Sequence, residues 1–257
     1  KKYCDICGEK IGLLGNKKLE DANMCKKCAS KLSPWFTGRR HTSLNEIKAQ
    51  LAYREANMEA VKEFNVTRVL GKTKKVYLDE DAKKFFVSSA SNYKDENPDV
   101  LDFSQVVGCD IDIDESRNEL TRADKDGKAV SYNPPRYEYE YDFDVIIRVN
   151  HPYFDEMKIR VNPSSVVLAQ QAGTASGMPG KVVKPSMIKN AVVNGEYQTY
   201  LTIAQDIKAA LTEARQSVRD EINAANAPKA AVTCPWCGAT TLPDASGCCE
   251  YCGGAVN

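Results

Sequence analysis

The sequence lacks any run of about 18 or more apolar residues, so no segment is expected to cross a membrane as a helix. It also has only two histidines, His41 and His151, and neither has a neighbouring residue that would complete a catalytic site. We interpret both as exposed histidines in turns and predict that the protein is not an enzyme. Its first residues, Lys1 to Cys4, contain no apolar stretch typical of a signal peptide, and we therefore expect a cytoplasmic protein.

The chain has no net charge, because 35 Lys and Arg residues balance 35 Asp and Glu residues, but its N-terminus is basic. Residues 1–42 contain ten Lys and Arg against four Asp and Glu, a net charge of +6. Zinc bound by four thiolates would lower this charge by about 2. The net charge that remains is small for a protein that binds nucleic acid. We therefore interpret the basic residues as a solubilising surface and keep nucleic-acid binding as the alternative. The alternative would use Lys17, Lys18, Lys26, Lys27, Lys31, Arg39 and Arg40 for phosphates, and Trp35 and Phe36 for stacking.

Eight of the ten cysteines form four Cys-x-x-Cys pairs, two near each end of the chain. The pairs are Cys4/Cys7, Cys25/Cys28, Cys234/Cys237 and Cys249/Cys252. Each pair offers two thiolates from one tight turn, and two pairs complete a tetrahedral Zn²⁺ site. We therefore predict two structural zinc ribbons and two zinc ions per chain. A redox role would place one pair at the start of a helix beside a βαβ unit, and we find no such unit.

The remaining two cysteines have less specific interpretations. Cys248 adjoins Cys249 and could replace it as a ligand, although the spacing of Cys249 and Cys252 repeats that of the other pairs. We favour Cys248 as a bystander and leave the substitution open. Cys109 lies on the apolar face of a predicted strand, where a small core residue is expected.

A linking helix is predicted from about residue 44 to residue 64. Ser43 and Glu46 form the capping box that starts it. An apolar stripe follows at helical spacing and is interrupted by Arg54. The stripe consists of Ile47, Leu51, Met58 and Val61.

Residues 66–161 are predicted to form strands, because apolar and polar residues alternate. In the cleanest strand, residues 137–149, every second residue from Tyr137 to Val149 is apolar or aromatic. A shorter strand at 157–161 should pair with it, since opposite charges then meet across the strands. The predicted register places Asp144 opposite Arg160 and Arg148 opposite Glu156. In an earlier strand, one face is expected to hold Val107, Cys109, Ile111 and Ile113.

Residues 164–195 are rich in small residues and are predicted to form a long loop, whose role the sequence leaves open. A second helix is predicted from about 195 to 224, with an apolar stripe that approximates a coiled-coil seam. The stripe consists of Tyr200, Ala204, Ile207, Leu211, Ala214, Val218 and Ile222. Self-association through the 195–224 helix is therefore one expectation.

Residues 4–36 carry the motifs Cys-x-x-Cys-Gly, Ile-Gly-Leu-Leu-Gly-Asn-Lys-Lys-Leu, Cys-Lys-Lys-Cys and Leu-Ser-Pro-Trp-Phe. This segment resembles the N-terminal zinc ribbon of a bacterial family of domains of unknown function, in which the ribbon precedes a β-rich domain. The resemblance implies that Cys4, Cys7, Cys25 and Cys28 bind zinc, and it brings no established activity. The centre is similar in layout to bacterial pleckstrin-homology-like domains. The C-terminal segment resembles the zinc ribbons that end many bacterial adaptor proteins.

These observations predict an α+β protein with a central bent antiparallel sheet and a long C-terminal helix, flanked by two Cys4 zinc ribbons. The expected domains are an N-terminal ribbon at 1–42, the linking helix at 43–65, a β-rich domain at 66–226 and a C-terminal ribbon at 227–257. The leading hypothesis is a non-enzymatic zinc protein that acts as an adaptor through an unidentified protein partner. An enzyme built on the 164–195 loop has no support from particular residues.

Overall fold

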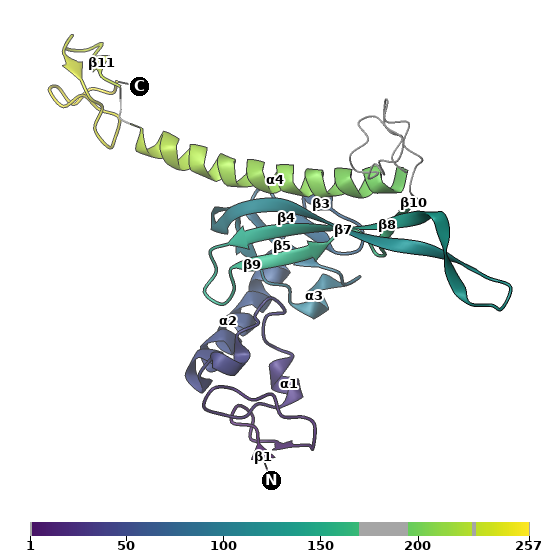
Figure 1. Ribbon diagram of the computed structural model, residues 1–257. Helices are drawn as coiled ribbons and strands as arrows, with labels where there is room; N and C mark the ends of the chain where they lie inside the picture. The colour runs from purple at the N-terminus through teal and green to yellow at the C-terminus, as the bar shows by residue number, and fades with distance from the viewer. Residues whose placement is uncertain (1, 170–194, 228–229, 257) are drawn as a thin grey trace, which may run out of the picture. The chain divides into compact units, whose positions relative to one another are not determined.

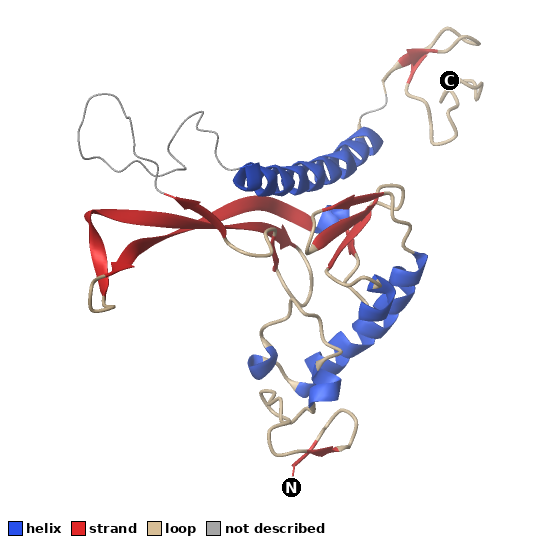
Figure 2. Ribbon diagram, turned by 90° about the vertical axis from the view of Figure 1, so that its right-hand side faces the viewer, coloured by secondary structure: helices blue, strands red, loops and turns tan. Residues whose placement is uncertain are grey.

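The computed structural model describes residues 2–169, 195–227 and 230–256 (Figure 1). The chain divides into two compact units, Lys1–Gln216 and Ser217–Asn257, which are described separately. Helices combine with antiparallel sheets, and a cysteine cluster lies near each end of the chain, which confirms the predicted α+β class (Figure 2). Most of the predicted 164–195 loop lies outside the described residues.

The first unit begins with a small ribbon of two short strands, β1 (Lys2–Tyr3) and β2 (Lys10–Ile11). A four-residue helix, α1 (Lys26–Ala29), follows, and then a 3₁₀ helix at Arg39–His41. The ribbon has a buried core made of three of its cysteines together with apolar residues. This core contains Cys4, Cys25, Cys28, Ile11, Leu19, Met24, Leu32 and, from the next helix, Ile47. The ribbon and that helix therefore share one core.

The linking helix α2 (Leu44–Glu63) begins where its capping box predicts. The Ser43 hydroxyl accepts a hydrogen bond from the Glu46 backbone N–H at 3.4 Å, and the Glu46 carboxylate accepts one from the Ser43 N–H at 2.9 Å. The Leu44 N–H donates to the Asp21 carboxylate at 2.8 Å. A residue of the ribbon thus satisfies one of the N–H groups that a helix leaves unpaired at its start.

The buried face of α2 is polar, which corrects the predicted stripe. Gln50, Arg54 and Asn57 are buried between Ile47 and Val61, whereas Met58 is exposed. The Arg54 guanidinium lies 2.7 Å from the Asp99 carboxylate and also donates to the Lys31 carbonyl at 3.1 Å. Arg54 does not interrupt the packing of the helix.

The ion pair of Arg54 and Asp99 is part of a set of hydrogen bonds that connects three segments distant in sequence. The Ser33 hydroxyl donates to the second oxygen of Asp99 at 2.7 Å, and the Ser33 N–H donates to Gln50 at 3.1 Å. Asn57 donates to the Pro98 carbonyl at 2.7 Å and accepts from the Val100 N–H at 3.0 Å. A buried polar network therefore joins the ribbon, α2 and the segment that precedes strand β6.

The first of two four-stranded antiparallel sheets follows α2. Its core includes Phe64, Tyr77 and Phe86, and the rings of Tyr77 and Phe86 stack with centroids 4.7 Å apart. A one-turn helix, α3 (Tyr93–Glu96), and a 3₁₀ helix, Phe103–Gln105, flank its last strand. The strands, in spatial order, are β3 (Arg68–Leu70), β4 (Lys75–Asp79), β5 (Lys84–Ser88) and β6 (Leu101–Asp102).

The second sheet is built on a long hairpin of β7 (Val106–Ala123) and β8 (Ala129–Val149). Strands β9 (Glu156–Arg160) and β10 (Val166–Ala169) pair with successive parts of the other edge of β8. The register places Asp144 opposite Arg160 and Arg148 opposite Glu156, as predicted. Strand β10 corrects the predicted loop, because residues 166–169 continue the sheet.

Two details of this sheet differ from the alternation pattern. A register shift between Val106 and Gly108 lets Val106 take the buried position, and Val107 is 50% exposed rather than inward. Asp144 is buried, although the alternation predicts that it faces outward. Its carboxylate can be buried because Arg160 and Lys158 lie 2.7 Å and 3.1 Å from it. Cys109 is buried on the core face, as expected.

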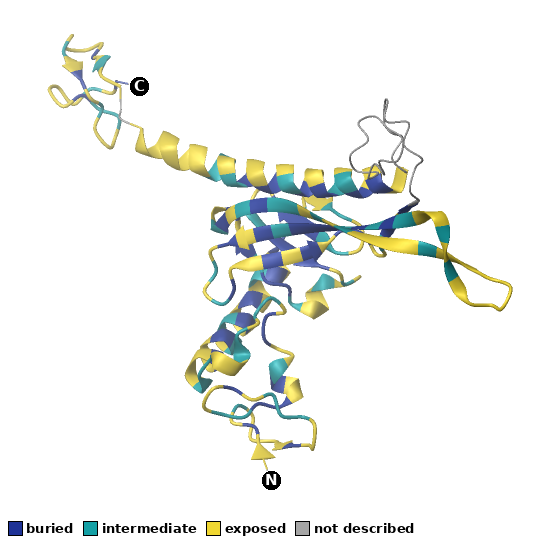
Figure 3. Cartoon of the chain, viewed as in Figure 1, coloured by how far each residue is buried: buried dark blue, intermediate teal, exposed yellow. Residues whose placement is uncertain are grey.

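The distal part of the β7–β8 hairpin, about residues 116–137, is mostly exposed and forms an arm (Figure 3). Arginine side chains lie over tyrosine rings along it: Arg117 over Tyr137 at 4.5 Å, and Arg136 over Tyr132 at 4.6 Å. Such cation–π contacts stabilise exposed strands modestly.

Helix α4 (Gly195–Asn226) confirms the second predicted helix. In the first unit it lies across the sheet (Figures 1 and 2), where Tyr197 packs edge-on against Tyr141 and Phe143 with centroids 5.0 Å and 4.9 Å away. Burial along the predicted stripe ends at Ala214, and Ile222 is 53% exposed. Most of the predicted coiled-coil seam is therefore covered within the chain.

The second unit contains the end of α4 and a ribbon with strands β11 (Val232–Thr233) and β12 (Thr240–Thr241). Its small core consists of Cys234, Cys249 and Val256. This core is too small to hold about 30 residues folded by apolar burial alone. A further source of stability is needed, and the cysteine cluster can supply it.

Candidate metal centres

The first cysteine cluster brings together Cys4, Cys7, Cys25 and Cys28. Their sulfur atoms all lie within 4.8 Å of one another, and the sulfurs of Cys7 and Cys25 are 3.8 Å apart. Two of the sulfurs accept hydrogen bonds from the backbone. The Cys25 N–H donates to the Cys4 sulfur at 3.3 Å, and the Cys28 N–H donates to the Cys25 sulfur at 3.4 Å. The four thiols therefore lie together in one cluster that could hold a metal ion.

The second cluster has the same composition and comes from Cys234, Cys237, Cys249 and Cys252. The sulfurs of Cys234 and Cys252 are 3.6 Å apart, and those of Cys237 and Cys249 are 3.8 Å apart. The N–H of Tyr251 donates to the Cys249 sulfur at 3.4 Å.

The sulfur spacing fits zinc. A Zn–S bond is about 2.3 Å long, so the edges of a tetrahedral ZnS₄ site are about 3.8 Å. The sulfur separations of 3.8 Å between Cys7 and Cys25, 3.6 Å between Cys234 and Cys252 and 3.8 Å between Cys237 and Cys249 match this edge. A disulfide requires about 2.05 Å, so these pairs are not bonded to each other. Each cluster is therefore compatible with one zinc ion held by four thiolates.

Three of the four pairs share one backbone turn. The backbone carbonyl of the first cysteine accepts a hydrogen bond from the N–H of the glycine that follows the second cysteine. The distance is 2.8 Å for Gly8, 2.9 Å for Gly238 and 2.8 Å for Gly253. These glycines have φ values of +74°, +72° and +71°. Residues with a Cβ atom rarely adopt this left-handed conformation, which explains why glycine follows each of these pairs.

The fourth pair, Cys25 and Cys28, has a different local structure, because it opens helix α1. Cys25 is the N-cap residue, and its sulfur accepts the N–H of Cys28. A helix start is one of the two features that a redox pair would need. The other feature, a βαβ unit, does not occur among the described strands, since these strands pair only in antiparallel fashion. The clustering with Cys4 and Cys7 favours a metal ligand.

The ionisation of the first cluster also fits a bound cation. Burial opposes ionisation of Cys4, but backbone N–H groups, those of Cys7 and Cys25 first, lower its pKa to about 6. Burial and then the neighbouring thiols raise the pKa of Cys28 well above its usual value. One thiolate forms readily and the last does not, because thiolates in contact repel each other. A divalent cation would offset that repulsion.

The second cluster behaves in the same way. Burial opposes ionisation of Cys249, but the N–H groups of Tyr251 and Cys252 outweigh it and lower its pKa to about 6. For Cys252, the N–H of Gly254 favours the thiolate, but the neighbouring thiols, that of Cys234 first, outweigh it and raise the pKa to about 12.

Cys248 lies outside this cluster. Its N–H donates to the Asp244 carboxylate at 2.9 Å, and its sulfur is 3.9 Å from the Ser246 carbonyl oxygen. Cys249 supplies the fourth sulfur instead. The structure thus supports the spacing argument that favours Cys249.

The two histidines differ. His41 is exposed in a 3₁₀ helix, as predicted. His151 is half-buried, which corrects the prediction of an exposed turn residue. Its Nε2 atom lies 2.8 Å from the Tyr53 hydroxyl, and its ring stacks on Phe154 at 4.0 Å. Burial lowers its pKa below 6.5, and the Asp99 carboxylate opposes that shift. No sequence signal links His151 to Tyr53, because 98 residues separate them.

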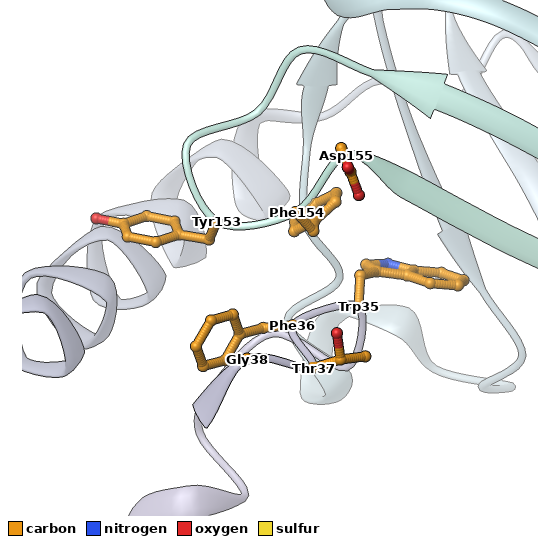
Figure 4. A pocket seen from close by; sticks show the side chains of 7 residues that line it. All are labelled: Trp35, Phe36, Thr37, Gly38, Tyr153, Phe154 and Asp155. Atoms are coloured by element: carbon orange, nitrogen blue, oxygen red, sulfur yellow. The ribbon is translucent and has the colours of Figure 1, made fainter. Parts of the chain in front are cut away.

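The aromatic residues after the first ribbon line a groove of about 340 Å³ (Figure 4). Trp35, Phe36, Thr37 and Gly38 form one side, and Tyr153, Phe154 and Asp155 from the β8–β9 loop complete it. Figure 4 shows Phe154 and Asp155 across from Trp35 and Phe36. Phe36 also packs against the ribbon core, which ties this wall to the first cysteine cluster.

The predicted basic residues of the ribbon are mostly exposed, but some are engaged. Arg39 donates to the Lys18 carbonyl, and Lys27 lies 3.8 Å from the Glu9 carboxylate. The Lys74 ammonium lies 4.7 Å from the centre of the Trp35 ring. Trp35 therefore already has a cationic partner on its ring.

Comparison with known proteins adds one finding. Residues 2–50 match a domain of unknown function, DUF4428. The matched residues include Cys4, Cys7, Cys25 and Cys28 and extend into the start of α2. It covers less than a fifth of the chain and carries no described activity.

No curated protein and no solved structure matches the chain. The resemblance of the centre to pleckstrin-homology-like domains therefore gains no support. Among the described residues, no helix combines the length and the apolar character needed to span a bilayer. The cytoplasmic location stays a prediction.

Proposed function

We propose that the protein is a zinc-dependent interaction module, an adaptor rather than an enzyme, that binds another protein through the groove beside its first ribbon. The observation that carries this proposal is the groove of about 340 Å³ with its aromatic lining. Aromatic side chains contribute a large part of the binding energy at protein interfaces. The groove suits an apolar side chain of a partner.

Zinc enters the proposal as the support of one groove wall. Phe36 packs against the ribbon core that includes three of the cysteines. A Cys4 site is closed to substrates, because four thiolates complete the coordination of the metal. Its contribution would be to hold the segment of Trp35 and Phe36 in place.

A protein partner is favoured over nucleic acid by the charge of the groove. Asp155 is the charged residue among those that line it, and its carboxylate would repel phosphate. Trp35 also has Lys74 over its ring, so stacking on a base would compete with an internal contact. Nucleic-acid binding through the basic ribbon is the alternative that the experiment below distinguishes.

The test is affinity capture from the native cell, with the zinc-loaded chain of 257 residues as bait. We expect a protein to be captured by the wild type and to be reduced about tenfold or more by Trp35→Ala, because a buried interface aromatic contributes at least that much. Tyr251→Ala is the matched control, since Tyr251 is a 70% exposed aromatic of the second unit. Both variants should keep their zinc.

Two results would contradict the proposal. One is capture that neither Trp35→Ala nor removal of zinc reduces. The other is salt-dependent retention of RNA or DNA that is lost when Lys17, Lys18, Lys26 and Lys27 are changed together, which would establish the alternative.

A further inference from the structure

Two adjacent leucines are held out from the first ribbon on a tight turn. The Gly15 N–H donates to the Gly12 carbonyl at 3.0 Å, and Leu13 and Leu14 occupy the two positions between them. Leu13 is 101% exposed and Leu14 is 86% exposed. Single exposed apolar residues are common on proteins. Two neighbouring leucines with almost no contact to their own chain are a feature that folding does not explain.

The turn is anchored on both sides, so the exposure is not that of a loose end. Ile11, just before the turn, is 7% exposed and belongs to the ribbon core. After the turn, the Asn16 side chain donates to Asn23 at 2.8 Å, and the Lys17 N–H donates to the Met24 carbonyl at 2.8 Å. The ribbon thus presents the two leucines on an ordered base.

Lysines surround this tip. Lys2 pairs with Ile11 in the β1–β2 register, Lys10 precedes the turn, and Lys17 and Lys18 follow it. Chain length limits the Cα atoms of Lys10 and Lys17 to about 11 Å from the nearer leucine, a little more than the Debye length of about 8 Å at physiological salt. Within the described part of the chain, none of these four lysines forms an ion pair.

Three of the four acidic residues of the ribbon have partners of their own, and the fourth, Glu20, follows the buried Leu19. Asp5 accepts a hydrogen bond from the Asn23 N–H at 2.7 Å, and Asp21 accepts one from the Leu44 N–H at 2.8 Å. Glu9 lies 3.8 Å from the Lys27 ammonium. The tip is therefore apolar at its end and basic around its base.

We propose that this turn docks the first ribbon on an anionic lipid bilayer. Leu13 and Leu14 would enter the outer acyl region, and the surrounding lysines would contact the phosphates of the headgroups. A bilayer accepts a protruding apolar tip without a shaped pocket, and its negative charge complements the lysines. A second copy of the ribbon is disfavoured as the occupant, because two zinc-loaded ribbons, each with a charge of about +4, would repel each other.

Both parts of the tip are needed in this mechanism. A small apolar anchor alone gives marginal, reversible binding, and stable attachment requires a second signal such as a basic patch. The expected binding is therefore reversible, selective for anionic vesicles and weakened by salt. It would place the groove of the proposed adaptor near a membrane, but it does not depend on that function.

The test is sedimentation of the zinc-loaded chain of 257 residues with vesicles. Vesicles of phosphatidylcholine with about 30% phosphatidylserine should bind the wild type, and vesicles of pure phosphatidylcholine should bind at least about tenfold less, given the contribution of each lysine near an anionic surface. The variant Leu13→Ser/Leu14→Ser should lower binding about a hundredfold, because each leucine contributes about tenfold or more on burial. Leu242→Ser is the matched control, since Leu242 is a 52% exposed leucine of the second unit.

The leucine variant should keep its zinc and its circular dichroism spectrum, because the replaced side chains have almost no contacts. Changing Lys17 and Lys18 to Glu should also reduce binding and should remove most of its salt dependence. The proposal is overturned if the wild type does not bind anionic vesicles, or if the double leucine variant binds as well as Leu242→Ser. Light scattering that reveals a dimer dependent on Leu13 and Leu14 would assign the tip to a second copy instead.

Discussion

Replacing Arg54 with methionine tests the polar core of α2. Methionine keeps much of the volume of the arginine stem but removes the charge, so it leaves the Asp99 carboxylate buried without its ion-pair partner. The Asp99 side chain is 0% exposed and that of Arg54 is 7% exposed. Removing one partner of such a buried pair costs about 3–5 kcal/mol of unfolding free energy. The Ser33 hydroxyl still donates to Asp99, so we expect the lower half of that range.

The control is an ion pair of similar length in the same helix. The Lys62 ammonium lies 2.8 Å from the Glu59 carboxylate, and the two side chains are 65% and 66% exposed. Lys62→Met should therefore cost only about 0.2–0.5 kcal/mol, as exposed pairs in helices do. Because the two distances are nearly equal, the difference between the variants reports burial.

The assay is urea denaturation of zinc-loaded protein that carries Trp236→Phe, so that Trp35 is its one tryptophan and reports the first unit. The midpoint should fall in Arg54→Met with an unchanged slope, which indicates a change in stability alone. In a double-mutant cycle, Arg54→Met and Asp99→Asn together should cost less than the sum of the two single changes. The reasoning is refuted if Arg54→Met costs no more than Lys62→Met.

Two further predictions concern local geometry and charge. Gly8→Ala should lower the stability of the zinc-bound ribbon by about 1–2 kcal/mol, because Gly8 has φ +74°. Gly12→Ala is the control and should have a smaller effect. A Cβ atom has open space at Gly8 and at Gly12, but only Gly8 has a positive φ. Equal losses of stability for the two variants in thermal melts would contradict this prediction. Burial opposes ionisation of Asp144, but Arg160 and Lys158 outweigh it and lower its pKa below 3.8. Arg160→Met should therefore lower the free energy of unfolding by about 1.5–3 kcal/mol above pH 3.8, and this loss should disappear as the pH falls through the lowered pKa of Asp144. Denaturation of the wild type and the variant across pH measures the difference. A difference in stability that stays constant with pH would contradict the prediction.

Local signals in the sequence were sufficient for several elements. The capping box of Ser43 and Glu46 specifies the start of α2, because both partners lie within four residues. Charge pairing specifies the β8–β9 register, because Asp144 and Arg160 are on neighbouring strands of one hairpin. Cysteine spacing indicates both cysteine clusters for the same reason, since the two cysteines of each pair lie in one local turn.

Features that depend on distant partners were not predictable in the same way. Arg54 reads as a break in an apolar stripe, because its partner Asp99 comes from a segment 45 residues later. His151 reads as exposed, because Tyr53 and Phe154 cover it only in the fold. Val107 reads as inward, because alternation does not reveal the register shift beside it.

The groove illustrates the same limit. Trp35 and Phe36 suggest an apolar patch in the sequence, but the residues opposite them, Phe154 and Asp155, lie more than a hundred positions away. Nearby in the sequence, Ser33 is held by Asp99, and Asp99 by Arg54, which are also contacts between distant segments.

The most direct test is the zinc content of the reduced chain of 257 residues after gel filtration. We predict two zinc ions per chain, with only sulfur ligands at about 2.3 Å by X-ray absorption. Cys25→Ser and Cys249→Ser should each remove one zinc, and Cys248→Ser should remove none. Less than one zinc per chain, or a nitrogen or oxygen ligand in either site, would contradict the two Cys4 centres on which the account rests.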